Sequence, residues 1–143
     1  MEIAIAEAEA AARRGEVPVG AVVVDGAGAV LAREGNRVEA EHDPTAHAEM
    51  LALRAACAAL GAPRLEGCDL FVTLEPCPMC AQAIAFARVR RLYFGAYDPK
   101  GGGVEHGPRI FTRSTCHYRP EVYGGLDEGR CADLMRSFFR ERR

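Results

Sequence analysis

The sequence predicts an α/β sandwich, in which helices cover the faces of a sheet. Short segments rich in β-branched residues alternate with longer segments whose apolar side chains recur at helical spacing. A hydrophobic content of 49% and a charged content of 27% are ordinary for globular chains and exclude a disordered one. No repeat or linker interrupts the 143 residues, so residues 1–143 are expected to form one domain.

The first third of the chain is expected to contain a helix and a hairpin. Residues 2–14 have apolar side chains at roughly helical spacing and lead to Gly15, a residue that commonly ends helices. Residues 17–24 are β-branched and predict a strand, and the turn at 25–28 should return the chain as a second strand over 29–34.

The middle of the chain is expected to carry two helices separated by a buried strand. Residues 36–44 are polar and predict a loop, after which Thr45 should cap a helix that continues to Leu60. Residues 70–74 predict a short buried strand. Pro78 suits the first position of the second helix, which should extend to about residue 87.

The last third is expected to be less regular. Residues 91–95 predict a strand, and residues 96–117 are rich in Gly and Pro and predict irregular structure. A final strand is expected at 121–123 and a terminal helix at 127–140.

Charge is divided unevenly between the halves of the chain, although the net charge is only −2. Residues 1–71 carry six arginines against twelve carboxylates, a net charge of −6. Residues 72–143 carry twelve basic against eight acidic residues, a net charge of +4. This asymmetry favours a charged partner for the basic half, unless folding mixes the two halves.

The sequence favours a cytoplasmic chain with no membrane partner. No apolar run approaches the roughly 18 residues of a spanning helix, and the acidic N-terminus is unlike a signal peptide. Six cysteines in such a chain are expected to be metal ligands or buried thiols rather than disulfides.

The strongest chemical signal joins His47 and Glu49 to a C-x-x-C pair, Cys77 and Cys80, about thirty residues downstream. One imidazole and two thiolates suit tetrahedral Zn²⁺, and three protein ligands leave a fourth position open, as in catalytic sites. A closed structural site would need a fourth ligand, and the candidates are His42, His106, Cys116 and His117. A redox role for the C-x-x-C pair is the other alternative, but it leaves His47 and Glu49 unexplained.

The ligand segments are both expected at helix N-termini, where the backbone N–H groups favour thiolate over thiol. His47 and Glu49 point in different directions on a regular helix, so they can share a site only if that site lies over the helix end. Two thiolates neutralise the charge of Zn²⁺ and weaken its activation of water, so a nearby carboxylate that moves protons is needed. Glu49 is the candidate for that catalytic role.

The motif and its surroundings resemble the bacterial tRNA adenosine deaminases, within the cytidine/deoxycytidylate deaminase superfamily. The similar segments are residues 16–21, 35–36, 43–49, 74–80, 94–96, 98–101 and 138–143. The resemblance implies a three-layer α/β/α sandwich with a five-stranded mixed sheet. It also implies a homodimer whose active sites lie at the subunit interface.

The resemblance implies a role for each matching residue. His47, Cys77 and Cys80 would bind one Zn²⁺ per subunit, and Glu49 would move protons. Asn36 would hydrogen-bond the target base, Val19 and Ala46 would line the base pocket, and a backbone amide in the Pro76–Cys77 segment would stabilise the developing oxyanion. The implied reaction is hydrolytic deamination of adenosine to inosine at the wobble position of a tRNA anticodon, with release of ammonia.

A tRNA anticodon stem-loop as partner requires a surface that complements phosphate. Basic residues gather at 88–100 and in the tail at 133–143, where they are interleaved with Phe138 and Phe139. The candidate RNA contacts are Arg37, His42, Lys100, Arg136, Arg140 and Arg142. The alternative for the tail is an amphipathic helix with its aromatic side chains buried and its arginines in solvent.

Two other functions remain open at this point. A deaminase of free guanine, cytosine or a related heterocycle would use the same zinc site without a basic groove. A catalytically silent zinc-binding or RNA-binding module would need neither Glu49 nor an open coordination position.

Overall fold

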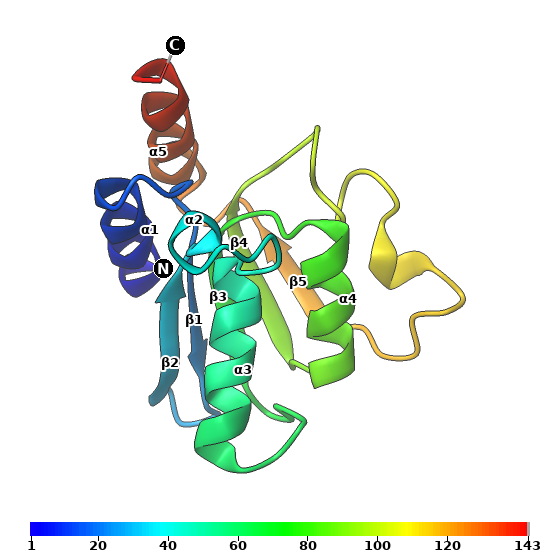
Figure 1. Cartoon of the computed structure of the whole chain (residues 1–143). Coiled ribbons are helices and arrows are strands. Elements are labelled where there is room, and N and C mark those ends of the chain that lie inside the picture. The colour runs from blue at the N-terminus through cyan, green and yellow to red at the C-terminus, as the bar shows by residue number, and fades with distance from the viewer. Residues whose placement is uncertain (143) are drawn as a thin grey trace.

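A computed structural model describes residues 1–142, and Arg143, the last residue of the predicted basic tail, lies outside them. The chain forms a five-stranded mixed sheet with helices on both faces, which confirms the predicted α/β sandwich (Figure 1). In chain order the elements are α1 (Glu2–Arg13), β1 (Gly20–Val24), β2 (Val30–Gly35), α2 (Val38–Glu41), α3 (Ala48–Leu60), β3 (Asp69–Leu74), α4 (Pro78–Ala87), β4 (Arg91–Ala96), the 3₁₀ helix η1 (Ile110–Thr112), β5 (Glu121–Gly124) and α5 (Glu128–Arg140).

The strands lie in the order β2-β1-β3-β4-β5. β1 pairs antiparallel with both β2 and β3, whereas β3–β4 and β4–β5 are parallel pairs. The parallel connections pass through α4 and through the 97–120 segment. The carboxyl ends of β3 and β4 therefore lie side by side at the same end of the sheet. There β3 leads directly into the segment that carries Cys77.

α1 and α5 pack on one face of the sheet because glycines let them approach the strands. A Cβ on Gly20 of β1 would clash with the backbone of Ala4 and Ala8 in α1. A Cβ on Gly95 of β4 would clash with the Cys131 side chain of α5. Gly is the residue that allows so close an approach, so these two positions fix where the helices sit.

α3 and α4 cover the opposite face, in front of the sheet in Figure 1. Alternate strand residues point toward them, including Val23, Leu70 and Phe94, which are all fully buried. The buried helix residues that pack with them are mostly alanines such as Ala52, Ala81 and Ala85, and small side chains let α3 lie close to β1 and β2.

Several element boundaries differ from the sequence-based expectation. β1 begins at Gly20 rather than at residue 17, because the segment before it contains Pro18 and turns back on itself through a Val19 N–H···O=C Val17 bond. The polar loop at 36–44 contains the short helix α2, and residues 96–117 contain η1. The expectation that Thr45 caps α3 is wrong, because its hydroxyl and its backbone N–H both donate to Asp43.

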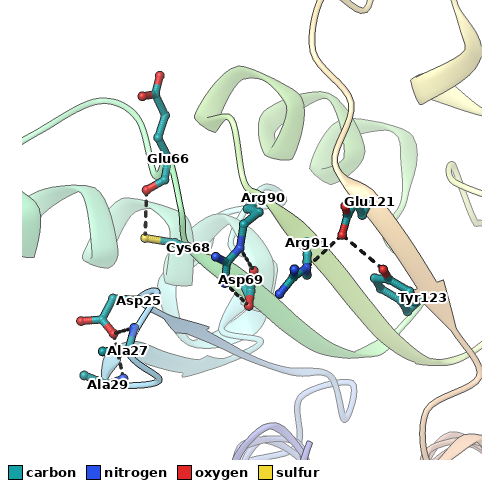
Figure 2. A network of polar contacts seen from close by, with 10 residues as sticks. All are labelled: Asp25, Ala27, Ala29, Glu66, Cys68, Asp69, Arg90, Arg91, Glu121 and Tyr123. Atoms are coloured by element: carbon teal, nitrogen blue, oxygen red, sulfur yellow. Dashed lines mark hydrogen bonds and ion pairs between the residues drawn. The ribbon is translucent and has the colours of Figure 1, made fainter.

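The edge strand β5 is short and is held to β4 by side chains as well as by backbone pairing. The rings of Phe71, Tyr93 and Tyr123 stack across β3, β4 and β5, with centroid separations of 4.5 and 5.0 Å. In the same region, Arg91 donates to Glu121, and so does the Tyr123 hydroxyl (Figure 2). Arg90 contacts Asp69 on the neighbouring strand through two hydrogen bonds.

All six cysteines are free thiols, as the sequence predicts. Within residues 1–142, no helix combines the length and apolar character needed to cross a membrane.

Candidate active site

The structure brings His47, Cys77 and Cys80 together, although they are thirty residues apart in the chain. His47 occupies the N-cap position of α3 and Cys77 that of α4, and Cys80 lies in the first turn of α4. The His47 Nδ1 atom lies 3.6 Å from each of the two sulfur atoms. All three donor atoms lie within 4.8 Å of one another.

This donor set fits Zn²⁺. Zinc bonds of about 2.3 Å to sulfur and about 2.1 Å to imidazole nitrogen, at tetrahedral angles, place N and S roughly 3.6 Å apart. The separations found here match that value, so the site needs no rearrangement to hold the ion. Among the described residues, the metal-binding group contains none of the four candidates for a fourth ligand. His106 instead contacts Glu75, and the Cys116 thiol donates to the Tyr118 carbonyl.

The thiols of the metal-free protein have very different acidities. A hydrogen bond from Cys80, with a further contribution from His47, lowers the pKa of Cys77 to about 4. The same hydrogen bond and burial raise the pKa of Cys80. The hydrogen bond to Cys77 also raises the pKa of His47. The two cysteines therefore share one proton, and a cation bound between them would favour both thiolates.

Glu49 stands beside this group on the first turn of α3 and is only 4% exposed. Burial, with the added charge of Cys77, raises the pKa of its carboxyl to about 7. A carboxyl whose pKa lies near neutrality can both accept and return a proton at physiological pH. His47 and Glu49 reach the same cavity because that cavity lies over the N-terminal end of α3, as their spacing requires.

Asn36 follows the last residue of β2 and takes the capping role that the sequence predicts for Thr45. Its side-chain oxygen accepts a hydrogen bond of 2.8 Å from the backbone N–H of Ala48, the first residue of α3. The backbone carbonyl of Asn36 accepts a hydrogen bond from Arg14. Asn36 is 8% exposed and lines the cavity, so one side chain positions the His47 helix and also faces the site.

A cavity of about 570 Å³ opens over these residues. Its walls come from the β1 approach, α2, the two ligand helices, the loop after β4, and α5. Val19 lines it as predicted, whereas the predicted pocket residues Ala46 and Pro76 are buried and do not form its wall. The lining residues include Glu16, Val17, Val19, Asn36, His47, Glu49, Leu74, Cys77, Asp98, Met135, Phe138 and Arg142.

A second cavity, of about 520 Å³, adjoins the first and shares Met135 with it. Its other lining residues are Lys100, Arg136, Phe139 and Arg140. Three of the candidate RNA contacts thus surround one cationic space, and a fourth, Arg142, lies over the Phe138 ring in the wall of the first cavity.

The remaining candidate RNA contacts lie elsewhere. Arg37 lines neither cavity and is 3.9 Å from Glu34, and His42 is exposed in a left-handed conformation at the end of α2. The predicted amphipathic character of the tail is partly correct: Phe138 is buried at 6% exposure, but Phe139 remains 47% exposed beside the cationic cavity.

Sequence reasoning assigned no role to two buried carboxylates of the site. Glu16 accepts hydrogen bonds from the Glu39 and Ala40 amides and so holds the start of α2 at the cavity. Glu75 accepts hydrogen bonds from the loop after β4, and these outweigh burial, so its pKa lies below the ordinary value. The position of Glu75, between a predicted strand and a proline, was the only hint that its charge has a role. The sequence could not show which groups it contacts, because they lie more than twenty residues further along the chain.

Comparisons with known proteins agree with this geometry. The family model for the cytidine and deoxycytidylate deaminase zinc-binding region matches residues 1–96. A tRNA-specific adenosine deaminase from Agrobacterium fabrum is 59% identical over 143 residues, which is 100% of this chain and 93% of the relative. Another from Bacillus subtilis is 47% identical, over 100% of this chain and 88% of the relative.

Solved structures extend the likeness to the fold. One, from studies of A-to-I editing by tRNA:A34 deaminases at the wobble position of transfer RNA, superposes with a TM-score of 0.92. It is 58% identical, and the match covers 94% of this chain and 96% of that one. A guanine deaminase from Nitrosomonas europaea has a TM-score of 0.80 at 25% identity, over 96% and 81% of the two chains. The chain belongs to the cytidine and deoxycytidylate deaminase family, among the relatives that are tRNA-specific adenosine deaminases.

Proposed function

We propose that this protein is a zinc-dependent hydrolase that deaminates adenosine to inosine at the wobble position of a tRNA anticodon and releases ammonia. The observation that carries the proposal is the His47, Cys77 and Cys80 group beside Glu49, within a cavity that adjoins a cationic one. The tRNA-specific adenosine deaminases to which the chain is similar over its whole length support the substrate class.

His47, Cys77 and Cys80 would hold one Zn²⁺ per subunit at the cavity that His47 and Cys77 line. When bound, Zn²⁺ lowers the pKa of a coordinated water and supplies the nucleophile at neutral pH. The N-terminal end of α4, where Cys77 is the N-cap residue and Cys80 lies in the first turn, would stabilise the two thiolates through its backbone N–H groups.

Glu49 would move the protons. Its carboxylate would take a proton from the attacking water, and its burial favours the protonated form. It then returns the proton to the departing amino group, so that adenosine and water give inosine and ammonia. The enclosed position of Glu49 limits exchange of this proton with solvent.

Asn36 and Val19 would orient the base. The Asn36 side-chain oxygen already accepts from Ala48, so its NH₂ group is the part left to donate to a ring nitrogen. Pro76 has no N–H, so the Cys77 amide is the donor in that segment for the oxygen that becomes the product carbonyl. Val19 offers an apolar surface to the base.

The second cavity would receive the RNA next to the target base. Lys100, Arg136 and Arg140 bring three positive charges to it, and the half-exposed Phe139 ring offers a surface for base stacking. The carboxylates that line the first cavity include Glu16, Glu39 and Asp98. Phosphates would therefore run along the α5 side, and Arg37 and His42 remain candidate contacts outside both cavities.

We further propose a homodimer, as the resemblance to the family implies. An apolar cleft between α3 and α4 is lined by Met50, Cys57 and Phe86, and Phe86 is 73% exposed. This face is our candidate for the subunit contact. Mass measurement by light scattering tests whether the protein is a dimer. A tRNA substrate implies a cytoplasmic location.

An ammonia-release assay tests the substrate. It compares an adenosine-containing anticodon stem-loop with free guanine, free cytosine and adenosine. We expect turnover on the stem-loop and little on the free compounds. Turnover on free guanine or cytosine alone would reject the proposal and indicate a free-base deaminase. The structural similarity to a guanine deaminase supports that alternative. Zinc binding without any turnover would indicate a silent module.

A further inference from the structure

Glu75 is a buried carboxylate to which neither the sequence motif nor the zinc chemistry assigns a task. It lies between the end of β3 and the Pro76–Cys77 segment, and its side chain is 0% exposed. An ionised group in such a position is costly unless its oxygens are fully hydrogen-bonded. Its partners therefore show what it is for.

Every hydrogen bond to the Glu75 carboxylate comes from the loop over residues 97–109, which we call the β4–η1 loop. Oε1 accepts from the Asp98 amide at 3.0 Å and from the His106 ring at 2.8 Å. Oε2 accepts from the amides of Val104, Glu105 and His106 at 3.2, 2.9 and 3.1 Å. One carboxylate thus holds both ends of the loop.

The loop is also shaped to reach this carboxylate. A Cβ on Gly102 would clash with Glu75 Oε2, and a Cβ on Gly103 would lie 2.6 Å from the Pro78 nitrogen. The Gly103 amide donates to the Pro76 carbonyl at 2.8 Å. Two glycines therefore let the loop lie directly against the segment that carries Cys77.

The same loop forms part of both cavities. Asp98 and Gly101 line the first, and Lys100 lines the second. The position of these residues relative to Cys77 depends on what fixes the loop. Two groups of contacts join the loop to the segment that carries Cys77. They are the hydrogen bonds to the Glu75 carboxylate and the hydrogen bond from the Gly103 N–H to the Pro76 carbonyl.

We propose that Glu75 is a positioning residue for substrate: its carboxylate holds the β4–η1 loop as the wall between the two cavities, at a fixed place relative to the metal ligands. The inference rests on the proposed function, because the loop wall is taken to contact RNA. Loss of the carboxylate should loosen the wall without removing a metal ligand or the proton carrier. Its main effect should be on KM for the stem-loop.

Two variants test this from opposite sides of the contact. Glu75→Gln keeps the size of the side chain but replaces one acceptor oxygen with an NH₂ group that faces backbone donors. Gly102→Ala leaves Glu75 intact and pushes the loop away from it. Glu105→Gln is the matched control, because that side chain is exposed on the same loop and only its backbone amide contacts Glu75.

The readouts are zinc content, residue-resolved amide exchange, and kcat and KM on the adenosine stem-loop. Both test variants should keep one zinc per chain and raise KM by up to roughly 100-fold, the loss expected when a site group is misplaced by about 1 Å, with a smaller change in kcat. Exchange should accelerate at Asp98, Val104, Glu105 and His106 but not in α1. Glu105→Gln should match the wild type.

Four outcomes would overturn the proposal. Unchanged loop exchange and KM in both test variants would show that Glu75 does not hold the wall. Faster exchange throughout the protein would show a role in stability alone, and loss of zinc with unchanged KM would show a role in metal binding. If neither variant folds, the wild type decides: fast exchange of the four amides would also contradict the proposal. Wild-type protein inactive on every stem-loop would instead reject the proposed function, while amide exchange would still test Glu75.

Discussion

At the scale of single residues, the site depends on how burial and hydrogen bonding set the acidity of a few groups. Glu49 is ordinary as a helix residue, but its place over the end of α3 removes it from water and raises its pKa to about 7. Cys77 is shifted in the opposite direction because Cys80 donates a hydrogen bond to it. The chemistry of both residues comes from their neighbours rather than from their side-chain type.

Glu49→Gln should reduce turnover by about 10²- to 10⁴-fold without loss of zinc or fold. The amide fills the same space but cannot accept and return a proton, and such proton transfer contributes about 10²- to 10⁴-fold to rates. Ammonia release and metal analysis measure the two properties on one sample. Glu66→Gln, an exposed glutamate that contacts Arg88, should match the wild type. Residual turnover near the wild-type level in Glu49→Gln would exclude the proposed role.

The metal-free protein should show two classes of thiol as pH changes. With a pKa of about 4, Cys77 is a thiolate from pH 6 to 8, so its alkylation rate should be nearly constant over that range. Burial raises the pKa of Cys57, so its rate should increase with pH. Iodoacetamide labelling with peptide mass spectrometry measures both rates on folded protein. Zinc should protect Cys77 but not Cys57, and a Cys77 rate that rises tenfold per pH unit would contradict the assignment.

At the scale of elements, the edge strand β5 has only four residues and pairs with β4 alone. Side-chain contacts help to hold it against β4. Tyr93 is the middle ring of the aromatic stack, with Phe71 on one side and Tyr123 on the other. Tyr93→Ala should destabilise the protein by about 1–3 kcal/mol, because each stacked pair contributes about 0.5–1.5 kcal/mol. Tyr93→Phe keeps the ring and should cost much less. Urea unfolding measures both, and equal losses would show that stacking is not the cause.

The ion pair beside this stack should be sensitive to acid. Arg91, with help from Tyr123, holds the pKa of Glu121 below its ordinary 4.5. A carboxyl whose pKa is lower in the folded than in the unfolded protein stabilises the fold at any pH above the unfolded-state pKa. That stabilisation is lost as the pH falls through the folded-state pKa. Arg91→Ala should therefore lower the melting temperature slightly at pH 7, and the difference should shrink as the pH falls below 4.5. A difference that stays constant as Glu121 becomes protonated would point to packing instead.

At the scale of the whole molecule, folding neither mixes the two charged halves nor keeps them fully apart. Lys100, Arg136 and Arg140 from the basic half meet at the second cavity, while Glu16, Glu39 and Glu49 from the acidic half line the first. A net charge of −2 therefore conceals a polarised active-site face. Under the proposed function, this polarity would direct the RNA toward the second cavity, which the overall charge does not indicate.

Replacing Arg136 and Arg140 together with Ala should weaken binding of the stem-loop and reduce its salt dependence. Each phosphate contact on single-stranded RNA contributes about 0.7 to the slope of log K against log salt, so loss of two contacts should reduce the slope by about 1.4. Fluorescence anisotropy from 50 to 200 mM salt measures it. Arg33→Ala, in an ion pair with Glu7 away from both cavities, is the control. An unchanged slope would show that Arg136 and Arg140 of α5 do not contact RNA phosphates.

The sequence by itself determined the order of the elements and the metal-binding group. These depend on local patterns: β-branched runs, helix-ending glycines, and the spacing of His47, Glu49, Cys77 and Cys80. Such patterns report on neighbouring residues, so they located each ligand at the start of its helix. The Thr45 cap failed for the same reason, since a local pattern cannot show that Asn36, from another element, satisfies the amide of Ala48.

Only the tertiary structure decided what surrounds the metal ligands. Met135 and Phe138 reach the cavity wall because α5 crosses the end of the sheet, and Glu75 meets its partners because β3 and β4 are parallel neighbours. These contacts join residues more than twenty positions apart. Burial of apolar surface places Met135 and Phe138, whereas the Glu75 carboxylate must find hydrogen-bond partners because its burial without them is costly, and the chain order does not state which partners those will be.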